Sequence, residues 1–469
     1  MALGVDGLVS GLDTTSLINQ LMQVEAGPQT ALKSKQSSTK ALVTALQALN
    51  TKTASLGTTA ATAAKPESWS VWKASVTGGA ATAPGAGATA SASASAQPGT
   101  LTFTVDAVAQ AQLSVTKVFS AASELFPTQP PTVTIQKADG TLVSVQPTTG
   151  DLAAVTKAIN DASAAGVKAT AVKVADGSYR LQFTGTTTGT AGAFTVYAGT
   201  SEQVTAGTAT KISGDTAVRA ATDATVTLWK DSAYEKSFTQ SSNTFTGLMT
   251  GVDITVSAVT GPADQPVTVT VARNDEALEK LTSDLVAGLN LVLQEVASRT
   301  RTTTTTNSDG STSVTGGLFT GDGTIRQLAQ QLATAASSPV DGRSPSTVGI
   351  VIGKDGAFTF DKAKFAAALA ADPARVQSTV SALAGRVQEV TTAASDPAKG
   401  SLTLKIKGQE GLVKDFGTQI ESWDRRLELR RTSLERTYAA LEVTLSKMQS
   451  QSSWLAGQLS SLSTNWSAD

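Results

Sequence analysis

A seven-residue repeat of apolar side chains runs along the C-terminal end of this 469-residue chain. Two neighbouring rows carry it, Leu434, Leu441, Met448, Leu455 and Leu462, then Tyr438, Leu445, Leu459 and Trp466. Seven-residue spacing keeps one apolar seam on one side of a helix, which is typical of a coiled-coil strand. Extended back to Ile420, such a helix would be roughly 70 Å long, more than one compact domain covers. The pattern predicts a helix that pairs with the N-terminus of its own chain or with other subunits.

The N-terminal region carries a matching pattern. Asp13 suits the N-cap of a first helix that Gly27-Pro28 ends, and Gly57 suits the C-terminal stop of a second helix. Leu17, Ile18, Leu21 and Met22 fall on one face of the first helix. An ordinary amphipathic helix on a local core would show the same pattern, but we expect the two chain ends to pair because both carry long stripes. The predicted seam residues are Leu17, Leu21, Leu42, Leu46, Leu49, Leu434, Tyr438, Leu441, Leu445, Met448, Leu455, Leu459 and Leu462.

Composition restricts the chemistry that the chain can perform. It has no histidine and no cysteine, which excludes His- or Cys-ligated metals, Ser-His-Asp triads and Cys-His pairs. No pair of carboxylates stands out as an acid–base dyad. A net charge of −1 gives no basic field for nucleic acid. We therefore expect no enzyme, no cofactor, no metal site and no nucleic-acid partner.

The order of elements predicts an α+β multidomain fold. Residues 77–100 are rich in Gly, Ala and Ser. Alternating Ser and Ala over 90–96 suit a weak strand, but the segment as a whole is interpreted as a linker. Residues 101–273 alternate as strands do, interrupted by one helix over 151–165, and helices return at 274. A Thr-rich loop is expected over 301–317, and Asp322, Asp361 and Asp372 are expected to start helices. N- and C-terminal helices would form a coiled-coil leg and a helical base domain around two inserted β-rich domains.

This organisation divides the chain into five predicted segments. They are an N-terminal leg over 1–40 that pairs with 430–469, a helical base domain over 41–73 plus 274–429, a β-rich domain over 74–125 plus 217–273, an outer β-rich domain over 126–216, and the C-terminal coiled-coil leg over 430–469.

Two polar clusters have a functional and an ordinary interpretation. Five arginines and four acids between 421 and 436 form either a docking surface or a solvated face joined by i,i+4 pairs, and the latter is favoured. Asn307-Ser308-Asp309-Gly310 resembles part of a calcium loop but lacks its ligand spacing, so a mobile loop is expected.

Several short stretches together resemble one known family. They are Gly7–Asp13, the Ile159-Asn160 pair, Asp176–Leu181, Ser242–Phe245, Gly321–Arg326 and Met448–Leu455. In this order, over nearly the whole chain, they are similar to the bacterial flagellar filament cap proteins, also called hook-associated protein 2. The region around Ile159-Asn160 resembles the Ile-Asn motif domain of flagellins and hook-associated proteins.

The resemblance implies a structural role outside the cell. It implies a ring-like homo-oligomer, a pentamer, at the flagellum tip, where it retains exported flagellin and promotes its folding and insertion. The implied partners are flagellin, the hook–filament junction protein and a cytosolic export chaperone that holds the C-terminal segment. Export would use the flagellar type III route without a cleaved signal peptide, since residues 1–13 lack the features of one. No apolar run is long enough to span a membrane.

Three further functions stay open. A secondary role in adhesion is compatible with the β-rich domains, and the same features suit a secreted adhesin on a coiled-coil stalk. Another axial flagellar protein, such as a junction protein, is the remaining alternative.

Overall fold

The computed structural model describes residues 13–80, 87–128, 130–213 and 217–465, with side chains up to residue 460. The chain divides into two compact units. The helical unit comprises residues 1–68 and 279–469, and the β-rich unit comprises residues 69–278. Their existence agrees with helical ends around a β-rich insert, whereas the finer division into five segments stays a prediction.

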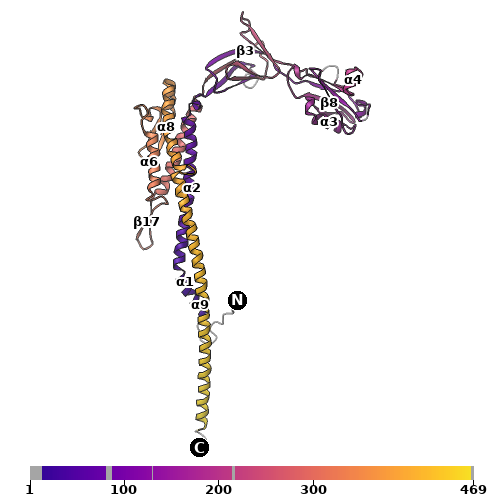
Figure 1. Ribbon diagram of the computed structural model, residues 1–469. Helices are drawn as coiled ribbons and strands as arrows, with labels where there is room; N and C mark the ends of the chain where they lie inside the picture. Colours follow the sequence, from indigo (N-terminus) through magenta and orange to yellow (C-terminus); the bar gives the residue numbers. More distant parts are fainter. Residues whose placement is uncertain (1–12, 81–86, 129, 214–216, 466–469) are drawn as a thin grey trace. The chain divides into compact units, whose positions relative to one another are not determined.

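Long helices dominate the helical unit (Figure 1). They are α1 (Thr14–Glu25), α2 (Gly27–Ala64), α5 (Asp275–Thr300, whose first residues belong to the other unit), α6 (Gly323–Ser337), α7 (Lys362–Ala371), α8 (Pro373–Ser395) and α9 (Ser401–Asn465). Two hairpins complete it, β16 (Thr303–Thr306) with β17 (Thr312–Thr315) and β18 (Ile350–Ile352) with β19 (Phe358–Phe360). α2 lies along both α8 and α9.

Aspartate caps begin the helices where the sequence predicts them. Asp13 accepts a hydrogen bond from the Ser16 N–H at 2.7 Å, and Asp361 and Asp372 cap α7 and α8 in the same way. Asp322 caps α6 and also forms an ion pair with Lys405 of α9 at 2.6 Å. Such caps satisfy backbone N–H groups that the first turn leaves without partners.

The predicted stop at Gly57 is wrong, because α2 continues to Ala64. A Cβ at Gly57 would lie 2.8 Å from Thr391 Oγ1 of α8. The glycine therefore permits close approach of two helices instead of ending one. α9 likewise begins at Ser401, well before the predicted Ile420.

The core of the helical unit lies between α2, α5, α6, α8 and the first turns of α9. Its fully buried side chains include Leu46, Leu49, Leu56, Leu332 and Val380. Glu295 of α5 forms an ion pair with Lys52 of α2 and a second, i,i+4 pair with Arg299 of its own helix. The hydrogen bond from Lys52 is the main cause that lowers the pKa of Glu295, and Arg299 adds to it.

The expected Thr-rich loop is a two-stranded ribbon. β16 pairs with β17 in antiparallel register from Thr303 opposite Thr315 to Thr306 opposite Thr312. Its turn is closed by the Asn307 N–H donating to the Ser311 carbonyl at 2.8 Å, and Gly310 has φ 81°. The residues that resembled part of a calcium loop thus form a hairpin turn.

Antiparallel strands build the β-rich unit. They are β1 (Trp72–Gly79), β2 (Ala88–Ala92), β3 (Gly99–Ala107), β4 (Leu113–Val115), β5 (Val133–Lys137), β6 (Leu142–Val145), β7 (Val167–Ala175), β8 (Ser178–Gly185), β9 (Phe194–Ala198), β10 (Thr210–Lys211), β11 (Ala224–Leu228), β12 (Lys236–Gln240), β13 (Thr244–Met249), β14 (Val252–Val256) and β15 (Gln265–Arg273). The sheet orders are β1-β15-β3-β11-β12, β13-β14-β2, β10-β9-β5-β6 and β4-β8-β7. Two short helices, α3 (Leu152–Asp161) and α4 (Ser201–Thr205), accompany them.

The expected linker over residues 77–100 is largely wrong. β1 continues to Gly79, and β2 pairs with β14 from Ala88 opposite Val256 to Ala92 opposite Val252. Small alanine side chains fit here because Ala88 is buried opposite Val256, a bulkier residue of the neighbouring strand. Composition typical of a linker therefore also suits a strand that packs closely.

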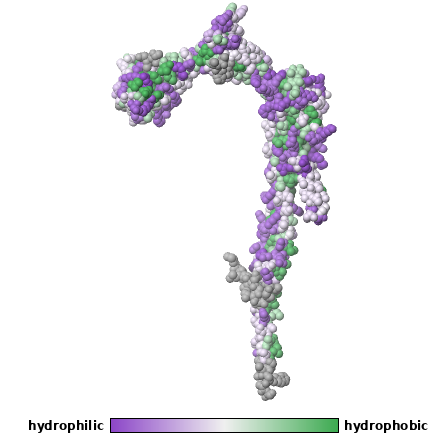
Figure 2. Space-filling model, turned by 180° about the vertical axis from the view of Figure 1, so that it is seen from behind, coloured by the Kyte–Doolittle hydropathy of each residue, from purple (hydrophilic) through white to green (hydrophobic). Residues whose placement is uncertain are grey.

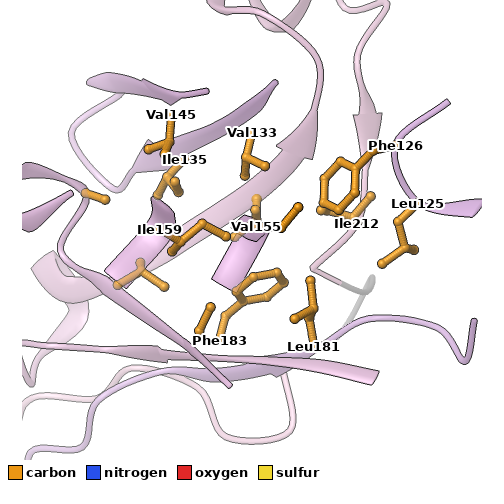
Figure 3. Packing of buried hydrophobic residues seen from close by; sticks show 14 of the residues in the cluster. Leu125, Phe126, Val133, Ile135, Val145, Val155, Ile159, Leu181, Phe183 and Ile212 are labelled. Atoms are coloured by element: carbon orange, nitrogen blue, oxygen red, sulfur yellow. The ribbon is translucent and has the colours of Figure 1, made fainter. Parts of the chain in front are cut away.

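Two hydrophobic cores form in the β-rich unit. The first, around Phe103, Val226 and Ile254, lies between the five-stranded sheet and β13-β14-β2. The second packs α3 against the other two sheets, with Val155 and Ile159 facing Ile135 and Phe183 (Figure 3).

The Ile159-Asn160 pair has two structural tasks at this place. Ile159 is fully buried, while the Asn160 side chain donates to the Ala169 carbonyl at 2.9 Å and accepts from the Ala169 N–H at 2.8 Å. One residue thus fills the core and the next fixes α3 to β7.

Candidate functional site

The C-terminal part of α9 presents the predicted apolar seam with little cover. We call Leu434, Tyr438, Leu441, Leu445, Met448, Leu455 and Leu459 the distal seam. Leu434, Tyr438 and Leu445 are half-buried. Leu441, Met448, Leu455 and Leu459 are 44%, 60%, 53% and 64% exposed. The Leu462 side chain and Trp466 lie outside the described residues.

Figure 2 shows hydrophobic patches along this distal part of α9. Two further apolar side chains, Val443 and Trp454, are 57% and 66% exposed there. A helix surface with this many exposed large apolar residues is typical of a face that packs on another protein.

The N-terminal helices follow α9 in antiparallel direction. Gln36 reaches the Val413 carbonyl, Gln29 reaches Asp424, and Glu25 forms an ion pair with Arg430 at 2.9 Å. Because paired helices advance by equal rises, Asp13 comes level with about residue 440 of α9. Within the described residues the predicted pairing of 1–40 with 430–469 is displaced, because residues 13–40 lie beside about 410–440 of α9. Residues 1–12 of the predicted leg lie outside the described residues.

The face of α1 that meets α9 differs from the predicted one. Thr14, Ile18 and Met22 are buried, whereas Leu17 and Leu21 are each 39% exposed. Both pairs of apolar residues sit at helical spacing, so the sequence allowed either face. Because Ile18 and Met22 are the buried pair, Leu17 and Leu21 are partly exposed to solvent. Val24 is 79% exposed.

The α2 members of the predicted seam lie in the core of the helical unit. Leu46 and Leu49 are fully buried and Leu42 is half-buried. α2 packs on α8 as well as α9, so these leucines contact their own chain. Whether any seam residue contacts another subunit stays a prediction.

Polar contacts hold α1 against α9 beside the apolar ones. We call Asn19, Glu25, Arg430 and Arg431 the clasp. Besides the Glu25–Arg430 ion pair, Arg431 donates to Asn19 Oδ1 at 2.8 Å. Within the Arg-rich cluster, Arg426 stacks on Trp423 at 4.0 Å, and Arg431–Glu435 is an i,i+4 pair at 3.9 Å. The expected face of i,i+4 pairs is thus mainly an interhelical clasp.

Two carboxylates with lowered pKa values, those of Asp151 and Asp396, serve local structure. Across its described residues no group of three acidic side chains could hold a metal ion, and no helix is long and apolar enough to cross a membrane. The pKa of Asp151 is lowered by hydrogen bonds from Thr149 and the Ala154 N–H, and the pKa of Asp396 by the Lys399 and Ala398 N–H groups. These are helix-cap and turn hydrogen bonds, which stabilise local structure.

Val443 is a contact candidate that the heptad rows missed, because it lies off both rows. Ile18 and Met22 belong to the predicted helix face together with Leu17 and Leu21, but the seam was assigned to the leucines alone.

Comparisons with known proteins identify the family. Its N-terminal model, described as the flagellar hook-associated protein 2 N-terminus, matches residues 10–112. The C-terminal model of the same protein matches residues 221–450. Together the two cover well over half of the chain.

Relatives agree with this assignment. Flagellar hook-associated protein 2 of Escherichia coli O157:H7 is 24% identical over 96% of this chain and 97% of its own length. Lateral flagellar hook-associated protein 2 of Vibrio parahaemolyticus is 25% identical over 43% of this chain, which spans 42% of that protein's length. The crystal structure of the D1-D2-D3 domains of the flagellar cap protein FliD from Escherichia coli matches with a TM-score of 0.57 at 21% identity, covering 78% of this chain and 99% of that one. The chain belongs to the flagellar hook-associated protein 2 family.

Proposed function

We propose that this chain caps the growing flagellar filament as a ring-like homo-oligomer, a pentamer, at its extracellular tip. There it retains exported flagellin and promotes the folding and insertion of each subunit. Family membership supports this role, and so does the cap protein whose crystal structure shares the fold.

The observation that carries the proposal is the exposed distal seam. Four large apolar side chains of one helix, at positions 441, 448, 455 and 459, are about half exposed or more. Burying the exposed half of a leucine contributes roughly 1 kcal/mol. Several such contacts per subunit would hold a cap on a filament, yet each is weak enough to be exchanged as the cap advances.

The exposed distal seam also supports the other proposed partners. An exposed apolar helix would associate in the cytosol, so a chaperone that covers the C-terminal segment before export is useful. A chain without cysteine forms no disulfides that would oppose unfolding for the type III route. At the filament the distal seam would meet flagellin and, before the first flagellin arrives, the hook–filament junction protein.

Complementation tests this function directly. In a strain lacking the gene, the full-length chain should restore filaments, and the Leu441→Asp/Leu455→Asp double variant should leave flagellin monomers in the medium. A charge on the seam opposes burial against any apolar partner. Cell-surface filaments are counted by electron microscopy, and secreted flagellin is measured in the supernatant.

Ser453→Asp is the matched control. Ser453 is exposed on the same helix, about 140° around the axis from Met448, so it adds a charge away from the seam. It should restore filaments as the parent does. Normal filaments in the deletion strain would instead contradict capping and favour a secreted adhesin, and loss of the hook–filament connection would favour a junction protein.

A secondary role in adhesion has one supporting observation. In the β11–β12 connection Trp229 and Tyr234 are 55% and 81% exposed and line a hollow of about 570 Å³ with Lys230 and Ser232. Trp229 and Asp231 have φ values of 52° and 63°, which non-glycine residues rarely adopt. Trp229→Ala/Tyr234→Ala should reduce binding of purified protein to host-cell glycoproteins while filaments form normally. Unchanged binding would remove this second role.

A further inference from the structure

Three glycines lie within ten residues of the long helix α9. They are Gly408, Gly411 and Gly417. Glycine is the least favourable residue in a helix interior after proline. A Cβ at Gly408 or Gly411 would meet nothing within 4 Å, so no close packing requires either glycine. The two glycines therefore lower the stability of this helical segment, and no close packing compensates for the loss.

The third glycine admits a side chain to the helix backbone. The Gln36 amide of α2 donates to the Val413 carbonyl of α9 at 3.2 Å. That carbonyl is the one to which an α-helix directs the Gly417 N–H. A Cβ at Gly417 would lie 3.3 Å from the same amide nitrogen. A side chain that enters the backbone hydrogen-bond ladder is a known cause of helix bending.

α2 carries three consecutive hydroxyl residues at the same level. Ser37, Ser38 and Thr39 follow Gln36, and the Thr39 hydroxyl donates to the Lys35 carbonyl at 2.8 Å, as other threonines of α2 do to their own preceding turns. Hydroxyls that bond back to the preceding turn slightly destabilise and bend helices. Both members of the helix pair therefore depart from regular helix chemistry where they face each other.

Packing is thin around this level. α2 has no buried side chain between residues 30 and 44, and α9 has none between 407 and 460. The last buried residues of α9 are Leu402 and Ile406, just before the glycines. Farther along, α1 and the start of α2 pair with α9 again through the buried Ile18 and Met22, the Gln29–Asp424 hydrogen bond and the clasp. Few buried apolar contacts and exposed backbone mark the segments that deform most easily.

We propose that residues 408–417 of α9, together with residues 36–39 of α2, form a hinge. The part of α9 anchored at Leu402 and Ile406 stays fixed, and the distal part bends with α1 about this level. Bending needs no partner, so the hinge can be measured in the free full-length chain whether or not it caps a filament.

The absence of cysteine makes a spin-label experiment straightforward. Labels on Ser401→Cys and Ser433→Cys, two α9 positions exposed on either side of the hinge, report the length of the intervening helix. A straight helix would separate the two backbone positions by about 48 Å. The parent should give a broad distance distribution that extends to shorter values. Dilution with unlabelled chain removes distances between molecules.

Gly408→Ala/Gly411→Ala should narrow this distribution towards the straight-helix distance, because the added methyl groups favour helix and meet no neighbour. Gln36→Ala should narrow it in part by freeing the Val413 carbonyl. Gly457→Ala is the matched control, since Gly457 lies in the same helix with nothing within 4 Å but outside the labelled interval. A narrow distribution in the parent, or equal widths in the parent and the double variant, would overturn the hinge.

Discussion

One apolar row of α9 passes through two different environments. Ile406 at its start is 9% exposed, and Val413, Ile420, Leu427 and Leu434 are half-buried. Leu441, Met448 and Leu455, later in the same seven-residue row, are 44%, 60% and 53% exposed. Within the described residues, cover decreases as α2 and then α1 come to their ends beside α9.

The difference separates two meanings of a heptad repeat. A repeat shows that a helix face needs a partner, and it does not show whose. Near Ile406 the partner is the chain itself, so the row stabilises the fold. Along the distal seam the partner is absent from the described chain, so the row is available for assembly.

Matched leucine truncations test this contrast with the largest expected effect. Leu402→Ala should lower the free energy of unfolding by about 2–5 kcal/mol, because Leu402 is fully buried and its removal leaves a cavity. Leu455→Ala should change it by less than about 0.5 kcal/mol, as exposed substitutions do. Urea unfolding followed by circular dichroism at 222 nm measures both. Equal losses in the monomeric chain would mean that the distal seam is covered in solution.

A smaller effect is expected at the ionic cluster of the buried half. Glu295→Gln should cost about 1.5–3 kcal/mol, the range for hydrogen bonds to charged groups. Lys52 and Arg299 lower the pKa of Glu295 in the folded chain. The free energy of unfolding that the Glu295 carboxylate contributes is therefore fully present above the ordinary pKa of about 4.3. This contribution is lost as pH falls through the lower folded-state pKa.

Unfolding of parent and variant between pH 7 and pH 3 gives this comparison. The control is Asp284→Asn on the same helix, which removes an exposed pair with Lys280 and should cost no more than about 0.5 kcal/mol. A difference between parent and Glu295→Gln that grows as pH falls would have the wrong sign for this account.

Local chemistry made much of the fold predictable. Aspartate caps at 13, 322, 361 and 372 lie where the sequence places them, because a cap depends on its next three residues. The strands over 252–256 and 267–271 follow from alternation for the same reason. Gly57 was misread because its role depends on Thr391, which lies far away in the sequence.

The other errors, in the fold and in the candidate site, also arise from contacts between distant parts of the chain. Residues 88–92 form a strand because β14 lies beside them, although their composition favours a linker. Leu17 and Ile18 both suit an amphipathic helix, and only the position of α9 decides which is buried. Sequence periodicity identified the distal seam, but its exposure depends on where the opposing helices end.

The smallest predicted effect concerns the clasp, at the boundary between the two environments. A double-mutant cycle of Glu25→Gln and Arg430→Gln should give a coupling of about 0.2–1 kcal/mol, because both side chains are largely in solvent. The coupling should fall markedly near 1 M salt, where the screening length of about 3 Å is comparable to the separation of the pair. Hydrogen exchange of α1 amides is the appropriate measurement, since α1 opens locally before the chain unfolds. If the protection of α1 falls together with the coupling, charge holds this helix against α9. If the protection survives high salt, burial of Ile18 and Met22 holds α1, and apolar packing alone covers this part of α9.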